Sequence, residues 1–201
     1  MRIGVVAFQG DFARHLEHLG KLDVEPIEVR TVADLSTCAG LVVPGGESTT
    51  IGKLLERFGL MEALRRSVTD GFPVFGTCAG AILLADTIEA SDQPRIGGIP
   101  MTVRRNAYGR QIASFESEVA IRDARFAAYS AIGQGENGMH GVFIRAPRII
   151  AIDPSVSEIL AYEDDPVCVQ KDNLLAATFH PELTPDVRLH RFFLQEVVAR
   201  A

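Results

Sequence analysis

The amino-acid sequence predicts an α/β fold, with a single doubly wound, mostly parallel sheet flanked by helices and extended by antiparallel strands. Short apolar runs alternate with helical patterns through the first half of the chain, and several of these runs are apolar on both faces. After Asp86 the pattern changes to short segments with a two-residue period. The chain has 201 residues and is 47% hydrophobic. That length suits one hydrophobic core, so we expect a single domain over residues 1–201.

The first half supplies the parallel part of the predicted sheet. In order it contains IGVVAF, the helical pattern DFARHLEHLG, VEPIEV, GLVVP, the helical stretch IGKLLERFGLMEALRRSV, PVFG and AILLA. The β-branched runs at residues 3–6, 41–43 and 73–75 have no polar face. Such runs are typical of parallel strands that helices cover on both sides.

The second half predicts antiparallel extensions of the same sheet. Its alternating segments are MTVRRNA, SEVAI, VFIRAP, RIIAID, EILAYED and VCVQKD. A buried strand, LLAATF, precedes HPE and a final helix with an inward stripe of Leu189, Phe192, Phe193 and Val197. The glycine-rich residues 131–141 are expected to form a surface connection without chemistry.

Charge and hydropathy exclude several functions. The net charge of −6 is spread without basic blocks, so neither nucleic acid nor an anionic membrane is an expected partner. No apolar stretch approaches the roughly 20 residues of a membrane-spanning helix. The apolar run near the N-terminus is too short for a signal peptide. We therefore expect a cytoplasmic protein.

Three cysteines are present, which fits neither a disulfide framework nor the paired spacing of a zinc site. Cys-Ala-Gly occurs at both Cys38 and Cys78, so context must separate them. Cys38 precedes a strand and Cys168 lies within an alternating segment, and packing explains both positions. Cys78 instead lies between the strand PVFG and the helical run AILLA.

Cys78 has a glycine two residues away on each side, Gly76 and Gly80, which is the pattern of a nucleophile elbow. A helix N-terminus and a nearby imidazolium lower the pKa of a cysteine thiol and so favour the reactive thiolate. The same helix start directs backbone N–H groups, including that of Ala79, at a developing oxyanion. Taken alone, the elbow is explained equally well by catalysis or by close packing in a glycine-rich turn.

His180 is the histidine best placed to serve Cys78. It follows the strand LLAATF and precedes proline, which favours an extended backbone at the carboxyl edge of the sheet. Glu182 is close enough to hold the far ring nitrogen. The simpler alternative is a strand-terminal histidine beside an exposed glutamate. We expect His15 and His18 to be surface or partly buried helix residues, His140 to lie in the glycine-rich loop and His190 in the last helix.

A glycine turn follows the strand GLVVP and leads into a helix. Ser48 or Thr49 is expected to cap that helix, while Gly46 offers an unhindered backbone N–H to an oxyanion. The string lacks the Gly-Lys-Ser/Thr ending of a phosphate-binding loop. Arg105 and Arg145 lie in short apolar strand segments, MTVRRNA and VFIRAP, where each either grips a carboxylate or is a solvated strand-edge residue. Spacing alone favours the solvated reading.

PGGES at 44–48, GTCAG at 76–80 and HPE at 180–182 resemble the class I glutamine amidotransferases, which have a flavodoxin-like fold and a Cys-His-Glu triad. AFQGD, PGGESTT, RRNAYGRQ, SFE, FIRAP and FHPE are similar to the glutaminase subunits of pyridoxal 5′-phosphate synthase. The chain departs from that family in an expanded connection through residues 127–141. The resemblance implies an ammonia-accepting synthase subunit as partner and L-glutamine as substrate.

The resemblance also assigns roles to residues. It implies Cys78 as nucleophile, His180 as acid and base, and Glu182 as the group that orients His180. The oxyanion would meet Gly46 and Ala79. The residues that it implies for glutamine binding are Gly46, Glu47, Ser48, Arg105, Ile144 and Arg145. We expect no metal and no cofactor.

Two other functions are compatible with the sequence. One is an elbow-cysteine hydrolase of γ-glutamyl peptides that works without a partner. The other is a binding or redox-sensing module that has the fold without turnover, although the presence of Cys78, His180 and Glu182 argues against it.

Overall fold

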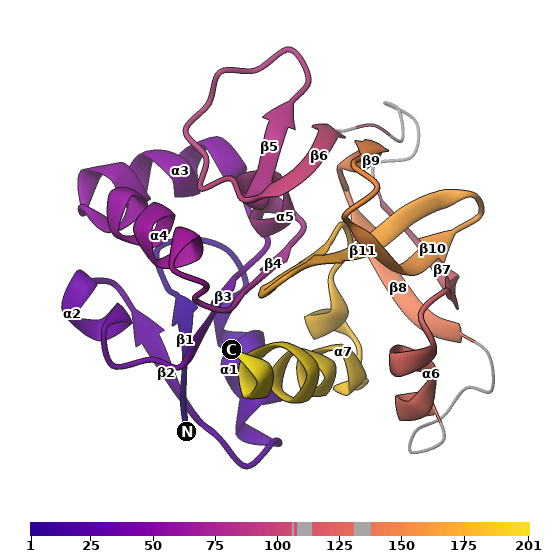
Figure 1. Cartoon of the computed structure of the whole chain (residues 1–201), viewed down its shortest axis with the longest axis horizontal. Helices are drawn as coiled ribbons and strands as arrows, with labels where there is room; N and C mark the ends of the chain where they lie inside the picture. The colour runs from indigo at the N-terminus through magenta and orange to yellow at the C-terminus, as the bar shows by residue number, and fades with distance from the viewer. Residues whose placement is uncertain (106, 108–113, 131–137) are drawn as a thin grey trace.

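Among the residues that the computed structural model describes, the main sheet has nine strands, in the order β2-β1-β3-β4-β12-β11-β10-β7-β8 (Figure 1). The structure describes residues 1–105, 107, 114–130 and 138–201. The parallel strands are β1 (Arg2–Val6), β2 (Glu25–Val29), β3 (Gly40–Val43), β4 (Val74–Thr77) and β12 (Leu174–Ala177). The antiparallel strands are β7 (Ser114–Ile121), β8 (Gly138–Ile144), β10 (Ser157–Tyr162) and β11 (Asp165–Lys171). The predicted α/β fold class is confirmed.

Helices cover both faces of this sheet (Figure 1). One face carries α2 (Val32–Leu35), α3 (Ser48–Arg57), α4 (Leu60–Thr69) and α5 (Ala79–Leu84). The other carries α1 (Phe12–Gly20), α6 (Ala124–Ser130) and α7 (Arg188–Phe192), which continues through the π-helical η2 (Phe193–Val197) and the 3-10 turn η3 (Val198–Arg200). A further 3-10 turn, η1 (Pro181–Leu183), follows β12.

The central strands are apolar on both faces because a hydrophobic core packs against each face of the sheet. In β3, Leu41 and Val43 pack toward α3 and α4, while Val42 between them packs toward α1 and α7. The last helical segment contributes its expected stripe, since Leu189, Phe192, Phe193 and Val197 are all buried. Burial on both faces explains why these strands show no polar alternation.

The expectation of a single sheet was wrong in one respect. β5 (Ala85–Ile88), β6 (Ile99–Arg104) and β9 (Arg148–Ile152) form a separate three-stranded sheet. β5 begins directly after α5 and is therefore carried onto the helical layer, where Ile88 and Met101 join the α3 and α4 core. A two-residue period identifies a strand but does not identify its partner.

The predicted surface connection at residues 131–141 can be compared with the structure only at residues 138–141. Residues 131–137 lie outside the described part of the chain, whereas residues 138–141 belong to β8 and were wrongly assigned to a loop. Of the helices that the structure describes, not one has the length and apolar character needed to cross a membrane.

Candidate active site

The carboxyl ends of β4 and β12 bring Cys78 and His180 to one edge of the sheet. The two strands are parallel neighbours, and their last residues, Thr77 and Ala177, are paired in register. The Cys78 N–H donates to the Ala177 carbonyl at 2.8 Å, so the pairing reaches into the turn. Residues that follow these strands must therefore meet above the same edge.

Cys78 adopts a backbone conformation that L-residues rarely occupy, with φ 47° and ψ −99°. The turn into α5 also needs small neighbours. A Cβ atom on Gly80 would lie 2.0 Å from the Val43 carbonyl oxygen, and one on Gly76 would lie 2.5 Å from the Gly80 backbone. The glycines thus let the helix start pack directly on the strands, and the thiol is displayed at the turn.

His180 is held by the chain on both sides. Its N–H donates to the Val142 carbonyl of β8 at 2.8 Å, and its ring Nδ1 lies 2.7 Å from Oε1 of Glu182. Pro181 begins η1, and this turn brings the Glu182 carboxylate to the Nδ1 edge of the ring. Gly45 permits the close approach, because a Cβ there would lie 2.3 Å from His180 Cε1.

The electrostatics favour a charged His180–Glu182 pair. Burial opposes the charge on His180, but the Cys78 side chain and the Glu182 carboxylate together outweigh it and raise the pKa of His180 to about 10. Burial likewise opposes the charge on Glu182, and the neighbouring His15 and His180 lower the pKa of its carboxyl below the usual value. Since Nδ1 binds Glu182, Nε2 is the nitrogen left for Cys78.

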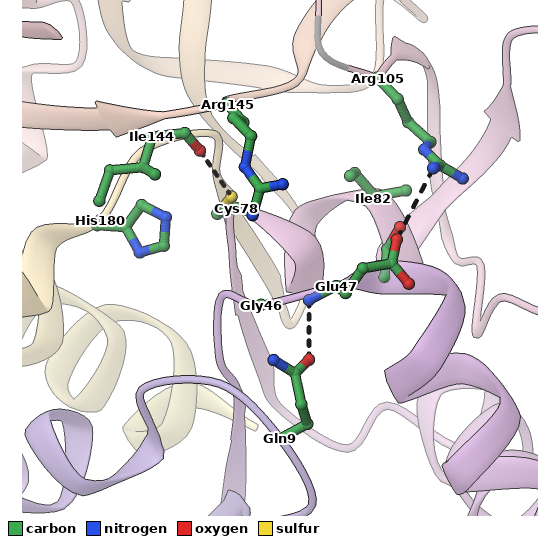
Figure 2. A pocket seen from close by; sticks show the side chains of 10 residues that line it. Gln9, Gly46, Glu47, Cys78, Ile82, Arg105, Ile144, Arg145 and His180 are labelled. Atoms are coloured by element: carbon green, nitrogen blue, oxygen red, sulfur yellow. Dashed lines mark hydrogen bonds and ion pairs between the residues drawn. The ribbon is translucent and has the colours of Figure 1, made fainter. Parts of the chain in front are cut away.

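A cavity of about 340 Å³ opens above this edge (Figure 2). Its lining comprises Gln9, Gly46, Glu47, Ser48, Cys78, Ile82, Arg105, Ile144, Arg145 and His180. Eight of these are residues predicted from the sequence to act on or bind the substrate. Glu182 lies behind His180, and Ala79 follows Cys78 at the start of α5, so neither lines the cavity.

The glycine turn after β3 differs from the sequence expectation in its cap. Glu47, and not Ser48 or Thr49, caps α3, because its Oε2 accepts from the Thr50 N–H at 2.8 Å. The Glu47 N–H donates to Oε1 of Gln9 at 2.8 Å, as Figure 2 shows. Gly46 has a φ of 155°, and a Cβ there would lie 2.6 Å from that same oxygen. Gln9 therefore holds the backbone of the turn.

Arg105 lies just after β6 and is fixed by several polar groups. Its Nη1 donates to Thr49 Oγ1 at 3.1 Å and to Gln93 Oε1 at 2.5 Å, and Nη2 lies 3.7 Å from Glu47 Oε1. The Gln93 oxygen also accepts from the Ser48 and Thr49 hydroxyls. Arg105 is therefore not a freely solvated edge residue.

Ile144 and Arg145 close the cavity from the antiparallel half of the sheet. The Ile144 carbonyl oxygen lies 3.9 Å from Cys78 Sγ. Arg145 follows the end of β8 with a φ of 44°, and its side chain points into the pocket (Figure 2). A non-glycine residue with positive φ at such a place is a feature of functional sites.

Sequence reasoning missed Gln9, Ile82 and Gln93 at this site. Gln9 had a usable signal, since it follows β1 at the same carboxyl edge as the glycine turn and Cys78. Gln93 had none, because it lies in an irregular segment whose contacts with Arg105 arise only in the folded chain.

The other cysteines and histidines do not line the cavity. Cys168 is fully buried in β11, and burial raises the pKa of its thiol well above the usual range. Cys38 is half-buried, and burial likewise raises the pKa of its thiol.

His15 and His18 are buried, with exposures of 0% and 3%, so the expectation of surface or partly buried helix positions was wrong. Within the described residues, we find no group of three or more potential metal ligands.

The fold and the pocket define an α/β protein with a cysteine elbow and a histidine–glutamate pair on one sheet edge. The model of the SNO glutamine amidotransferase family matches residues 5–199, and the chain belongs to this family. It is 48% identical over 197 residues to the pyridoxal 5′-phosphate synthase subunit PdxT of Carboxydothermus hydrogenoformans, covering 98% of each chain. Identity to the same subunit of Moorella thermoacetica is 48%, over 98% of this chain and all of the relative. A crystal structure of a glutamine amidotransferase superposes with a TM-score of 0.87 at 44% identity, covering 98% of each chain.

Proposed function

We propose that this chain hydrolyses L-glutamine to L-glutamate and ammonia, as the glutaminase subunit of a pyridoxal 5′-phosphate synthase. One observation carries the proposal most directly: Cys78, His180 and Glu182 converge at the edge of a pocket in a glutamine amidotransferase fold. The relatives named as synthase subunits match over nearly their whole length, which supports the specific assignment.

The first half of the reaction forms a thioester. The Cys78 thiolate attacks the carboxamide carbon of glutamine, and the N–H groups near Gly46 and Ala79 hold the resulting oxyanion. His180 gives a proton from Nε2 to the leaving nitrogen, and ammonia departs. The high pKa of His180, about 10, suits a group that must begin this step protonated.

The second half releases glutamate. His180, now neutral, removes a proton from water, which attacks the glutamyl thioester and frees the Cys78 thiolate. Glu182 stays charged throughout and holds Nδ1 of His180. Nε2 is therefore the nitrogen that gives the proton in the first half and takes it in the second.

The remaining lining residues suit the free amino-acid end of glutamine. Arg105 and Arg145 offer guanidinium groups to its α-carboxylate, and Glu47 offers a carboxylate to its ammonium group. Glu47 Oε1 lies near Arg105, so the pocket presents a negative and a positive group side by side. The ammonium and carboxylate groups of zwitterionic glutamine carry the complementary charges. The proposed binding set is therefore Gly46, Glu47, Ser48, Arg105, Ile144 and Arg145.

The ammonia acceptor is proposed to be a separate synthase subunit. Ammonia in bulk water is mostly protonated and is then no nucleophile, so direct transfer to a docked partner preserves its reactivity. We further propose that residues 1–201 act as a single glutaminase domain in the cytoplasm.

The test is glutamate release with and without a co-expressed synthase subunit, for the wild type and for Cys78→Ala. The proposal expects release that rises when the synthase is present and is lost in the variant. Cys38→Ala is a matched control, because this cysteine shares the Cys-Ala-Gly string but lies outside the pocket. Unchanged release by Cys78→Ala, or rapid hydrolysis of γ-glutamyl peptides by the isolated chain, would contradict it.

A further inference from the structure

A cluster of buried histidines lies directly beneath the candidate triad. His15 and His18 come from α1, and His190 comes from α7. The His15 and His190 rings are tilted at a centroid distance of 5.1 Å, and His18 meets His190 edge-on at 4.8 Å. The steps proposed above use none of these groups. Buried imidazoles need partners, so their contacts indicate what they do.

His15 contacts Glu182 and also the strand that leads to Cys78. Its Nε2 lies 3.1 Å from Oγ1 of Thr77, the residue before Cys78, and 3.4 Å from Oε2 of Glu182. The side chains of His15 and Glu182 are both 0% exposed. Glu182 uses its other oxygen, Oε1, for His180. The carboxylate thus lies between two imidazoles, one on the pocket side and one in the core.

The contacts of His15 select its tautomer. A bare Nε2 lone pair would face the Glu182 carboxylate at 3.4 Å between two fully buried side chains, whereas an Nε2–H turns a positive hydrogen toward this region. Oε2 makes no hydrogen bond in the described part of the chain, so the approach of His15 Nε2 is an electrostatic contact with a buried oxygen that lacks a hydrogen-bond partner there. The bare Nδ1 of His15 then accepts from Nε2–H of His190, 2.8 Å away. His190 is left with an unprotonated Nδ1, which matches the lack of a hydrogen-bond partner for that atom among the described residues.

Burial keeps His15 uncharged. It lowers the pKa of His15 to about 4, even though the Glu182 carboxylate acts in the opposite direction. Burial also lowers the pKa of His190 well below its ordinary value. At neutral pH His15 is therefore a neutral N–H donor, and it does not compete with His180 for the proton that the reaction moves.

We propose that His15 is a positioning residue for the His180–Glu182 pair. The Nε2–H edge of His15 faces Oε2 of Glu182 at 3.4 Å, and this electrostatic contact steadies the carboxylate and so aims His180 at Cys78. The contact with Thr77 joins the same imidazole to the strand that carries Cys78. This inference rests on the proposed function for its kinetic readout, but alkylation of Cys78 tests it independently.

Three variants of the full chain, assayed with the synthase subunit, separate positioning from packing. His15→Leu removes the donor, and His15→Gln keeps an N–H in nearly the same place. His18→Leu removes a buried imidazole from the same helix whose ring packs on His190, with neither Thr77 nor Glu182 as a hydrogen-bond partner among the described residues. The readouts are kcat and KM for glutamate release, and the rate at which iodoacetamide alkylates Cys78, followed by mass spectrometry of its peptide.

The expected result is a donor-dependent loss. His15→Leu should lower kcat by about tenfold or more and leave KM within about twofold, because the residue acts on a catalytic group and not on the substrate. Alkylation of Cys78 should slow in parallel. His15→Gln should recover most of both rates, and His18→Leu should resemble the wild type.

Two results would overturn the inference. One is wild-type kcat and alkylation in His15→Leu. The other is an equal loss in all three variants, which would show that the cluster acts only through packing. If the wild-type complex releases no glutamate, the proposed function fails, while the alkylation rates still decide the role of His15. If His15→Leu does not fold, His190→Leu and His190→Gln repeat the comparison one hydrogen bond farther out, with the same order of rates expected.

Discussion

Nδ1 of His180 lies 2.7 Å from Oε1 of Glu182, only two residues along the chain, and the buried carboxylate is fixed there by the turn that Pro181 begins. This short connection leaves the pair little freedom. Nδ1 must be protonated to donate to the carboxylate, so Nε2 is available for chemistry at Cys78. A change at Glu182 should therefore act on the protonation of His180 more than on substrate binding.

Glu182→Gln is expected to lower kcat by roughly 100-fold or more with little change in KM for glutamine. The amide can donate to Nδ1 of His180, which would place the ring proton on Nε2 and prevent that nitrogen from acting as a base. Steady-state glutamate release with the synthase subunit measures the effect. Glu116→Gln is a suitable control, because that carboxylate contacts the exposed His140 on β8. Near-normal kcat in Glu182→Gln would show that the charge is not needed.

The site was predictable from the sequence where short-range pattern determines geometry. Two glycines around Cys78 predict a strand-to-helix turn, and proline after His180 predicts an extended strand end. Since parallel strands share a carboxyl edge, these two local features suffice to place both residues together. The roles assigned to Cys78, His180 and Glu182 remain predictions.

Features that depend on long-range packing could not be predicted. His15, His18 and Leu19 have the spacing of one buried helix face, but a histidine is counted as polar in such a pattern. Only the fold shows that Glu182 and His190 lie opposite and satisfy the His15 ring. The separate sheet of β5, β6 and β9 was missed for a related reason, because alternation does not reveal which strand pairs with which.

The pKa of His180 predicts a pH-dependent contribution to stability. Its folded value of about 10 exceeds the ordinary value of 6.5, so the native state binds more protons than the unfolded state between these values. This contribution is fully present below pH 6.5 and is lost as pH rises through about 10. The wild type should therefore lose more free energy of unfolding than His180→Gln does over this interval. Urea unfolding at both ends of the interval measures the difference, with His140→Gln as an exposed-histidine control. Parallel curves for the wild type and His180→Gln would contradict the prediction.

The backbone of Cys78 predicts an unusual order of stability among its variants. At φ 47° and ψ −99° a Cβ is unfavourable, and such a conformation costs on the order of 1–3 kcal/mol in a non-glycine residue. Cys78→Gly should consequently be more stable than Cys78→Ala by about 1 kcal/mol, although glycine normally destabilises. Chemical denaturation measures the free energy of unfolding of each variant.

Cys38 provides the matched comparison, because it is not among the residues with positive φ. There the ordinary order should hold, with the alanine variant at least as stable as the glycine variant. If Cys78→Ala were as stable as Cys78→Gly or more stable, the prediction would be wrong. The turn would then accommodate a Cβ atom at position 78 without backbone strain.

Gln93 is expected to control the affinity for glutamine through Arg105. Its Oε1 accepts from Arg105 Nη1, Ser48 Oγ and Thr49 Oγ1, so Gln93→Ala leaves three donors without their shared acceptor. Because Arg105 lines the pocket away from the reacting bond, KM should rise about tenfold while kcat changes much less. Gln93→Glu keeps an acceptor of the same shape and should remain near the wild type. Gln170→Ala, which changes a buried glutamine of β11 outside the pocket, should leave KM unaltered even if it lowers stability. A wild-type KM in Gln93→Ala would mean that Thr49 and Glu47 suffice to hold Arg105.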